Sequence, residues 1–553
     1  MILTRRAALV GTAAVATSAA LAACGGNNAD GLESTTLHLG NGAEPLSLDP
    51  HIASGTWENR IIGDMLIGLT TEDAQARPIP GMATEWTTSD DGLVWTFKLR
   101  DAVWSDGVAV TADDFVFAFQ RLFTMQPSAK YASLQYVIKN AQRIHTSAGT
   151  ANAVPASELG VKAIDPKTVE FTLEHPAPYL PGLFTHYTAF PVPKHAVEAH
   201  GKDWVEPGKY LANGPYVLEQ WKLNDFVHVK KNDRYWDAAS VCLSQVFFYP
   251  TSDDTSAERQ MRSGELDVQT NFSGSRLEEI NRNLPGYARV HTYLGLTYYL
   301  FNMRNEKFQD KRVRQALNMA LDREFITNDI LKGGQQPAYS LVPPGIADFQ
   351  SGTSRLGWSE VPRAERLVQA KALLEEAGYG PDKPLKFSLA HRNSGDNPRI
   401  VPVVQGNWRD IAPWVEPELI GADTQLNYEK LRTGDFEVGD AGWIADFNDA
   451  KNFIYLFETR TGQMNYGQYS NPEYDRLAAA ADVEADAATR VRLMKQAEKV
   501  LLDDEGVMPV FFLTNRNLVS PRVSGWVDNA TDIHRLRYLC LEGAAAAGGT
   551  EKK

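Results

Sequence analysis

Cysteine is scarce in this chain of 553 residues, which has only Cys24, Cys242 and Cys540. The last two lie too far apart in the sequence to form a metal cluster of the zinc-finger kind. Their surroundings, "SVCLSQVFFYP" and "RLRYLCLEG", are both strand-like. In an exported chain they are compatible either with a disulfide or with two buried free thiols, and neither is expected to be catalytic.

The chain also lacks the motifs of the common enzyme classes. It has no G-x-S-x-G elbow, no G-x-x-x-x-G-K-[ST] phosphate loop and no dinucleotide-binding fingerprint after a strand. The segment "HAVEAH" brings His195, Glu198 and His200 together, but its histidines are five positions apart. On a helix they would point about 140° apart instead of sharing a face. We therefore expect a helix-opening segment here, and no catalytic residue, metal ligand or cofactor.

Blocks of lysine and arginine are absent as well, and the formal net charge is −14. This balance argues against a nucleic-acid partner. A hydrophobic content of 43% with 22% charged residues is ordinary for a globular protein and excludes a largely disordered chain. The length exceeds what one hydrophobic core usually serves, so two or three lobes are expected.

The N-terminus carries an apolar run that follows Arg5 and Arg6 and ends at Ala23. It is shorter than the roughly 20 apolar residues of a membrane-spanning helix, so residues 1–23 are predicted to be an export signal. Its end, "LAAC", resembles the bacterial lipobox, which makes Cys24 the lipidated first residue of the mature chain. An ordinary cleavage site before a cysteine is the alternative. Both the twin-arginine and the general export route remain open.

Strand-like and helix-like patterns mix along the rest of the chain, which predicts an α/β protein. Residues 24–33 are polar and glycine-containing, as in a flexible tether. Thr111 is placed to cap a helix in "VTADDFVFAFQRLF". Helical periodicity predicts further helices over 312–331 and 488–506. Residues 542–553 are expected to form a disordered tail.

One long segment carries a family resemblance. Residues 81–121, "GMATEWTTSDDGLVWTFKLRDAVWSDGVAVTADDFVFAFQR", resemble the signature of extracytoplasmic solute-binding proteins that serve ABC-type peptide importers. Within that family the likeness is strongest to the oligopeptide-binding members. It extends in the same order through "SLDPH" (47–51), "NGPYVL" (213–218), "RSGELDV" (262–268), "YYLFNMRNEKFQDKRVRQALNMALDRE" (298–324) and "GWIADFND" (442–449).

The resemblance implies a periplasmic-binding-protein-like fold of type II, cluster C, with mixed sheets. Such a protein has three lobes and closes like a flytrap around its ligand. Residues 34–66, 191–294 and 511–541 would form a discontinuous first lobe, residues 67–190 the second and residues 295–510 the third. The implied function is that of a lipid-anchored monomer that binds oligopeptides. It would deliver them to the permease subunits of an ABC transporter that has separate ATPase subunits.

The resemblance also assigns candidate ligand-binding residues. Taken alone, Asp446 in "GWIADFND" is best explained as a turn residue, because Asp side chains bond nearby backbone groups. In the family, the aspartate at this position binds the α-ammonium group of the peptide. Asp449, in contrast, is expected to be a turn or surface residue. The other implied ligand contacts are Ala441, Gly442, Trp443 and Ile444 on a strand, Ser54, Gly55 and Thr56 on a loop, and Tyr131 and Asn271.

The chain departs from the family where relatives bind the peptide carboxylate with cationic or imidazole side chains. Those positions here hold Asn397, Leu431 and Asp440. Asp440 could favour peptides with basic side chains or ligands that lack a free carboxylate at that place. Alternatively, it faces water or pairs with a neighbouring arginine. The cations that could substitute are Arg392, Arg399 and Arg432.

Three other functions remain open. A receptor for cell-wall peptides or for another solute would share the same features. A secreted hydrolase is disfavoured because its motifs are missing. A chaperone-like envelope protein that uses the same cleft is the third alternative.

Replacing Cys24 tests the lipid anchor. We expect Cys24→Ser to give an exported protein that is no longer held at the membrane, because the thiol that accepts the lipid is gone. Fractionation into membrane and soluble material measures the change. A variant that stays with the membranes as fully as the wild type would contradict the lipobox assignment.

Overall fold

The structure is a computed structural model that describes residues 35–542, apart from 126–127, 130, 252, 347–348, 350–351 and 353. The predicted export signal, Cys24, the tether and the tail beyond residue 542 lie outside the described residues. No helix among the described residues combines the length and the apolar character needed to cross a membrane.

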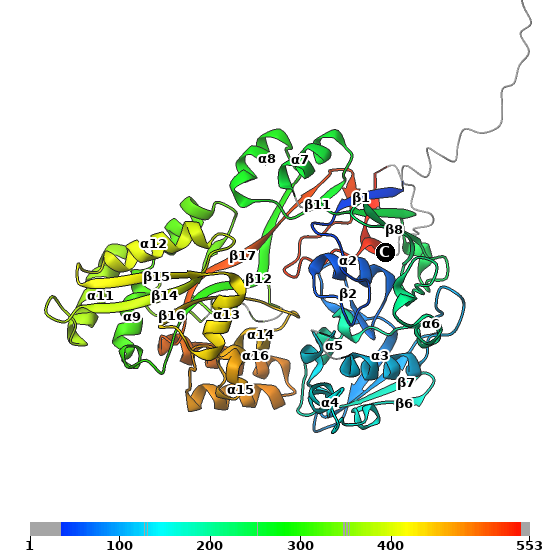
Figure 1. The fold of residues 1–553 in the computed structure, drawn as a ribbon, viewed down its shortest axis with the longest axis horizontal. Coiled ribbons are helices and arrows are strands. Elements are labelled where there is room, and N and C mark those ends of the chain that lie inside the picture. Colours follow the sequence, from blue (N-terminus) through cyan, green and yellow to red (C-terminus); the bar gives the residue numbers. More distant parts are fainter. Residues whose placement is uncertain are drawn as a thin grey trace, which may run out of the picture.

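An eleven-stranded mixed sheet runs through the molecule (Figure 1). Its order is β15-β14-β16-β12-β17-β11-β1-β10-β9-β8, and β13 pairs with β17 beside this path. The strands are β1 (Thr36–Gly40), β8 (Tyr216–Lys222), β9 (Phe226–Lys231), β10 (Gln245–Tyr249), β11 (Val268–Thr270), β12 (Ala288–Phe301), β13 (Gln336–Pro337), β14 (Leu385–Arg392), β15 (Val415–Ala422), β16 (Val438–Ile444) and β17 (Met508–Val519).

The two long antiparallel strands β12 and β17 connect the halves of the molecule (Figure 1). One end of β17 pairs with β11, whereas β12 pairs with β16 from Gly295 to Phe301. Between these ends the β12–β17 register shifts, at Thr292–Leu296 and again at Thr297–Tyr298. Bulges of this kind bend a strand and increase its twist, so the sheet changes direction where it passes from one half to the other.

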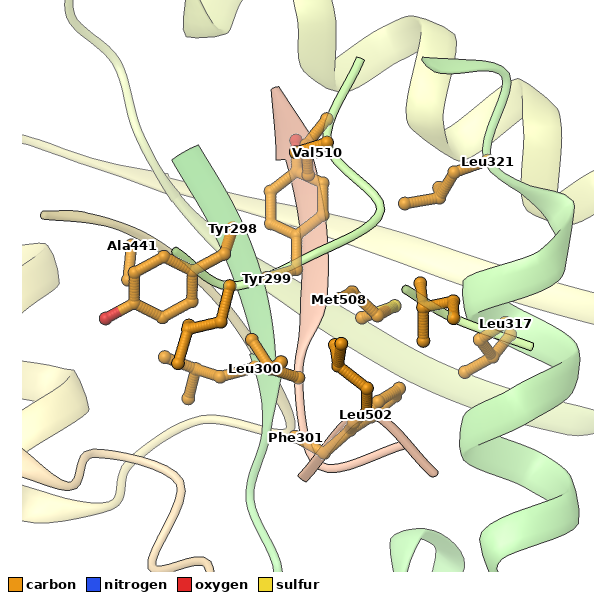
Figure 2. Packing of buried hydrophobic residues seen from close by; sticks show 14 of the residues in the cluster. Tyr298, Tyr299, Leu300, Phe301, Leu317, Leu321, Ala441, Leu502, Met508 and Val510 are labelled. Carbon is orange, nitrogen blue, oxygen red and sulfur yellow. The ribbon is translucent and has the colours of Figure 1, made fainter. Parts of the chain in front are cut away.

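Two large apolar cores lie on the two sides of this crossing. One extends from Leu294 to Phe512, almost the range of the expected third lobe. Figure 2 shows how its side chains pack around β12, where Tyr298 and Leu300 alternate with Tyr299 and Phe301. The other core joins residues 37–248 with 519–541, so the expected first and second lobes share one core. The boundary between those two lobes stays a prediction.

A second sheet, of order β4-β5-β7-β6, lies within the range expected for the second lobe. Its helix α3 (Ala112–Thr124) begins as predicted, in a capping box made by Thr111 and Asp114. After β5, Val103 and Ala109 form an isolated bridge. The strands are β4 (Ala83–Thr88), β5 (Val94–Leu99), β6 (Val161–Asp165) and β7 (Thr168–Thr172).

The helix predicted over 312–331 is broken. Helix α9 (Lys311–Ala320) ends because Leu321 is extended, and Asp322 then caps a new turn by accepting a bond from the Phe325 amide. The break lets the buried Arg323 side chain donate hydrogen bonds to backbone carbonyls instead of continuing an apolar helical face. The late helix α16 (Ala487–Asp503) is confirmed, as is the helical state of "KHAVEAH" in α6 (Lys194–His200).

The described residues also form further α-helices and strands. They are α2 (Thr56–Met65), α4 (Ala141–Ser147), α5 (Leu180–Leu183), α7 (Asp254–Ser263), α8 (Leu277–Asn283), α10 (Arg323–Phe325), α11 (Arg363–Glu376), α12 (Asn397–Arg409), α13 (Thr424–Thr433), α14 (Lys451–Ile454), α15 (Pro472–Val483), β2 (Thr70–Glu72), β3 (Pro78–Pro80), β18 (Val523–Ser524) and β19 (Cys540–Leu541).

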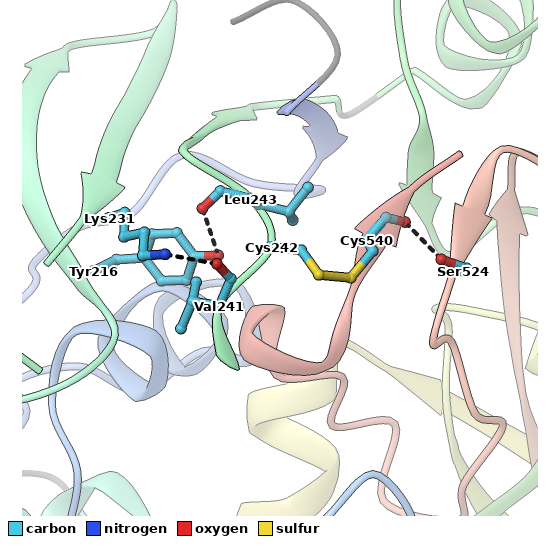
Figure 3. Close-up of a disulfide and its surroundings, with 7 residues drawn as sticks. All are labelled: Tyr216, Lys231, Val241, Cys242, Leu243, Ser524 and Cys540. Carbon is cyan, nitrogen blue, oxygen red and sulfur yellow. Dashed lines mark hydrogen bonds between the residues drawn. A yellow bond between two sulfur atoms is a disulfide. The ribbon is translucent and has the colours of Figure 1, made fainter. Parts of the chain in front are cut away.

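Cys242 and Cys540 form a disulfide that spans 298 positions of the sequence (Figure 3). This is one of the two states that the sequence leaves open. Cys242 precedes β10, and Cys540 lies in β19, which pairs with β18. The bond therefore links the C-terminal segment around β19 to the segment just before β10 of the eleven-stranded sheet.

Removing this disulfide is expected to lower stability. A cross-link that closes a long loop limits the unfolded ensemble, and loss of a native disulfide typically costs about 2–5 kcal/mol. We expect Cys242→Ser/Cys540→Ser to lower the free energy of unfolding by that amount, measured by urea unfolding. Wild type under reducing conditions should match the variant. Identical curves for the oxidised wild type and the variant, or peptide mapping that finds both thiols free, would contradict the assignment.

Candidate ligand-binding cleft

A cleft with a cavity volume of about 900 Å³ lies between the two halves of the molecule. One wall comes from the loop before α2, from Tyr131 and from the segment 531–535. The other comes from β16 and the residues that follow it, with β12 and β17 between them. The cleft thus lies against the strands that connect the two halves.

An open strand edge faces this cleft. β14 pairs with β16 only at Val438 and Gly439, whereas β12 pairs along the whole of β16. The amide of Ala445 donates to the Leu294 carbonyl (2.8 Å), so the alternation of an antiparallel ladder turns the backbone groups of Gly442 and Ile444 away from β12. An extended peptide can add to an edge of this kind through main-chain hydrogen bonds.

The predicted strand residues do not all reach the cleft. Gly442, Trp443 and Ile444 line it, and the Trp443 indole is oriented by a hydrogen bond to Asn452 (3.0 Å). Ala441 is fully buried in the core that extends from Leu294 to Phe512, where Figure 2 shows it beside Tyr298. The Ala441 side chain thus points away from the cleft, and a ligand contact through its backbone stays a prediction.

Asp446 lines the cleft directly after the strand. Its amide donates to Asn452 (3.4 Å), but its carboxylate accepts no hydrogen bond and has no cation within ion-pair distance among the described residues. Burial raises the pKa of the Asp446 carboxyl to about 6. The group interacts electrostatically with Tyr131, Tyr187 and Tyr455 around it. A desolvated carboxylate without a counter-charge can bind a small cation, and a turn residue has no such need.

Asp449 lies in a turn, as the sequence predicts, but it also makes an ion pair that the sequence does not reveal. Its carboxylate accepts two hydrogen bonds from Arg490 of α16, at 2.7 and 2.9 Å, and a third from the Lys451 amide. The Arg490 side chain is almost completely buried. Asp449 thus anchors the segment after β16 to a helix, and this contact holds Asp446 in place.

The opposite wall contains the predicted loop Ser54, Gly55 and Thr56. The buried Glu58 carboxylate accepts the amides of Ser54 (3.0 Å) and Gly55 (2.6 Å), so these two donors are already used. The exposed Thr56 opens helix α2 and lies on the cleft. This loop therefore offers the cleft a stiff surface with few free amides.

Tyr131 and Asn271 also lie on the cleft, as the family resemblance implies. Tyr131 is 36% exposed and stacks on His186, with ring centroids 5.9 Å apart. Asn271 has a left-handed backbone, with φ of 64°, and its amide donates to the Asn517 side chain (3.2 Å). These bonds hold both residues at the cleft wall.

The structure corrects the expectation for Asp440. Its carboxylate is fully buried and lies outside the cleft lining, and it accepts hydrogen bonds from Arg392 (2.8 and 3.0 Å) and from Asn397 (2.7 Å). Pairing with a neighbouring arginine, the alternative for Asp440, is thus observed. Arg392 and Asn397 both reach the cleft, whereas Leu431 belongs to the core that extends from Leu294 to Phe512.

Two of the substitute cations do not line the cleft. Arg432 pairs with Glu429 at 2.9 Å, and Arg399 pairs with Asp396 at 3.3 Å. Two cations that sequence reasoning missed do line it, Arg60 on α2 and Arg516 on β17. Their position follows from the packing of distant segments, and no local pattern marks them.

Arg60 and Arg516 have no carboxylate within ion-pair distance among the residues that the structure describes. Arg60 donates to the Asn41 side chain (2.6 Å), and Arg516 donates to the Phe272 carbonyl (2.9 Å) and to Thr514 (3.1 Å). Burial lowers the pKa of both guanidinium groups. Among the described residues, Asp446, Arg60 and Arg516 are thus cleft groups that make no ion pair, although Asp532 acts electrostatically on Arg60 and Asp396 on Arg516.

Comparison with known proteins shows which family this chain resembles. The family model "Bacterial extracellular solute-binding proteins, family 5 Middle" matches residues 77–465. The periplasmic oligopeptide-binding protein OppA of Salmonella typhimurium is 36% identical over 528 residues, which cover 93% of this chain and 94% of the relative.

Solved structures agree with this result. A structure titled as the murein tripeptide binding protein MppA in an unliganded open form is 32% identical, with a TM-score of 0.83 over 92% of this chain and 98% of that one. Haemophilus influenzae OppA in complex with RPPGFSPFR is also 32% identical, with a TM-score of 0.72 over 92% and 99%. The α/β fold with its mixed sheets is that of a multi-lobed periplasmic binding protein. This chain belongs to family 5 of the bacterial extracellular solute-binding proteins.

Proposed function

We propose that this protein is an extracytoplasmic receptor that binds oligopeptides in the cleft and delivers them to an ABC importer. The observation that carries the proposal is the isolated Asp446 carboxylate at the end of an open strand edge. Every unmodified peptide has an α-ammonium group and a regular backbone, so a site that binds these two features accepts many sequences.

In the proposed complex the α-ammonium group pairs with Asp446, and the peptide backbone lies along Gly442 and Ile444. The peptide carboxylate would meet a cation of the cleft. Arg392 is already neutralised by Asp440, whereas Arg516 is not, which favours Arg516 for this role. A desolvated charge pair in a closed cleft strengthens binding when both partners are held in place.

The likeness to relatives supports a peptide ligand but does not select one. One relative is named for oligopeptides, and the other structure is titled for a murein tripeptide. A receptor for cell-wall peptides is the second candidate, and it would use the same Asp446 contact. We favour oligopeptides because the contacts available at β16 are to backbone groups, which do not depend on side-chain identity.

Membrane attachment and transport belong to the same proposal. Lipidation at Cys24 would hold the receptor at a membrane through its tether. Permease subunits would receive the peptide, and separate ATPase subunits would supply the energy. The family consists of binding proteins, and we expect no catalysis by this chain.

The two halves are arranged as in an open state. At equal identity and almost equal coverage, the TM-score is 0.83 for the unliganded open form and 0.72 for the peptide complex. The better fit to the open form supports an open arrangement of the halves in this structure. Phe447 already stacks on Tyr179 across the gap, with ring centroids 5.1 Å apart. This stack provides a first contact for closure.

Peptide binding is expected to close the cleft. Saturating peptide should decrease the radius of gyration measured by small-angle X-ray scattering, because the halves move together around the β12–β17 crossing. Calorimetry on the same sample establishes saturation. A radius that stays unchanged while calorimetry reports binding would contradict closure.

Asp446 provides the sharpest test of the binding mode. Asp446→Asn should weaken a peptide with a free N-terminus by about 2–5 kcal/mol, because the ammonium group loses its counter-charge. N-acetylation of the peptide should weaken wild-type binding similarly. The two losses should not add, since both remove one interaction. In the wild type the affinity should also fall about tenfold per pH unit below pH 6, where the carboxylate becomes protonated.

A matched control is Asp435→Ala, which removes an exposed carboxylate of the same half that pairs with Lys430. Its affinity should stay within about 0.5 kcal/mol of wild type. Asp449→Ala is unsuitable as a control, because it would leave Arg490 buried without its partner. Fully additive losses, or an acetylated peptide that binds wild type as tightly as the free one, would contradict the role of Asp446.

A further inference from the structure

Two histidines and an aspartate come together beside the cleft, next to the β12–β17 crossing, and two of them, Asp532 and His534, line it. His291 lies on β12, and Asp532 and His534 lie on the loop after β18. One ligand atom from each of the three lies within 4.8 Å of the others. His534 Nε2 lies 3.1 Å from Asp532 Oδ1, and His291 Nε2 lies 3.8 Å from the same oxygen. We infer that these residues form a binding site for a divalent transition-metal ion of the Zn²⁺ class.

His291 is the observation that points to a ligand. Its side chain is only 12% exposed, and neither ring nitrogen has a hydrogen-bond partner of good geometry among the described residues, although the ring also interacts with the Asn529 backbone. Buried polar atoms are nearly always hydrogen-bonded, so an imidazole that lacks both bonds calls for an explanation. A metal ion bound to Nε2 satisfies one of these nitrogens, and Asp528 lies 3.8 Å from the other.

The loop that carries Asp532 is held in shape before any ion binds. The Asn529 side chain accepts hydrogen bonds from Thr531 (3.0 Å) and from the Ile533 amide (3.2 Å). Asp532 itself is left-handed, with φ of 56°, a conformation that costs energy and often occurs at functional sites. The surrounding structure therefore holds this carboxylate in a fixed place.

Further contacts orient the ligands from outside the cluster. The Asn517 side chain donates to Asp532 Oδ1 (2.7 Å), and Trp526 stacks on the His534 ring with centroids 3.7 Å apart. The Ala530 carbonyl accepts the Leu294 amide (2.9 Å), which fixes the loop against β12. Outer contacts of this kind hold metal ligands in orientation.

The donor set selects the class of ion. Two imidazoles with one carboxylate suit Zn²⁺ and its neighbours, whereas Mg²⁺ and Ca²⁺ prefer oxygen ligands. Three protein ligands leave a fourth position for water or a ligand group. Asp532 and His534 line the cleft, so the proposed site lies next to the peptide-binding space. Arg60 interacts with Asp532 and opposes the ion, whereas Asp528 beside His291 favours it.

Zinc binding by the purified mature protein without a histidine tag or added peptide tests the site. Equilibrium dialysis with metal analysis by mass spectrometry should find one Zn²⁺ per wild-type chain. His291→Ala and His534→Ala should each weaken that binding at least tenfold, because each removes a ligand. His195→Ala is the matched control. It also breaks a histidine–aspartate pair, with Asp106 at 2.9 Å, but far from this cluster, and should bind Zn²⁺ like wild type.

Two further measurements separate loss of the site from loss of the fold. Zn²⁺ should raise the unfolding temperature of wild type and not that of the two variants, whose near-ultraviolet circular dichroism should match wild type. Co²⁺ in wild type should give visible absorption bands typical of nitrogen and oxygen ligands at a four-coordinate ion. The inference would be overturned if wild type did not bind stoichiometric Zn²⁺, or if the His291→Ala and His534→Ala variants each bound Zn²⁺ as tightly as wild type. Neither result depends on whether peptides bind.

Discussion

The antiparallel pair β12–β17 is the constraint on which the rest of the structure depends. Its two strands belong to both halves, and its register shifts near the middle, where the sheet bends. The cleft lies against this bend because the strands on either side diverge from it. The edge of β16 is open because β16 pairs with β12 beyond the point where its pairing with β14 stops. Any movement of one half relative to the other must pass through these two strands.

Charges are treated differently in the core and in the cleft. In the half that contains β16, Lys451 lies between Glu458 and Asp482. In the other half, Arg535 pairs with Glu72. These buried ions have their counter-charges, whereas the buried Glu498 carboxylate makes no ion pair among the described residues and instead accepts the Leu341 and Val342 amides. In the cleft, Asp446 lacks such a partner. The charged form of Asp446 is therefore destabilised by burial in the folded protein, and a cationic group of a ligand would stabilise it.

Sequence patterns anticipated the local features and the family position of Asp446. The Thr111 cap and helix α16 follow from near neighbours in the chain, so periodicity and capping chemistry suffice to predict them. The burial of Asp440 beside Arg392 could not be predicted, because it depends on how β14 and β16 pair. The cluster around His291 is equally hidden, since His291 lies more than two hundred positions before Asp532 and His534 and meets them only in the folded protein.

The distribution of isolated charges has a consequence for how closure is coupled to the ligand. Asp446 follows β16 in one half. Arg60 lies on α2 in the other half, and Arg516 on β17 pairs with Val290 on the far side of the register shift from β16. In the proposed complex a peptide zwitterion would thus have its two ends on different halves. Its ammonium and carboxylate groups then draw the halves together, and a ligand with only one of these charges loses that coupling. Recognition of the termini and closure of the cleft become one event, because the ligand itself supplies the electrostatic link between the halves.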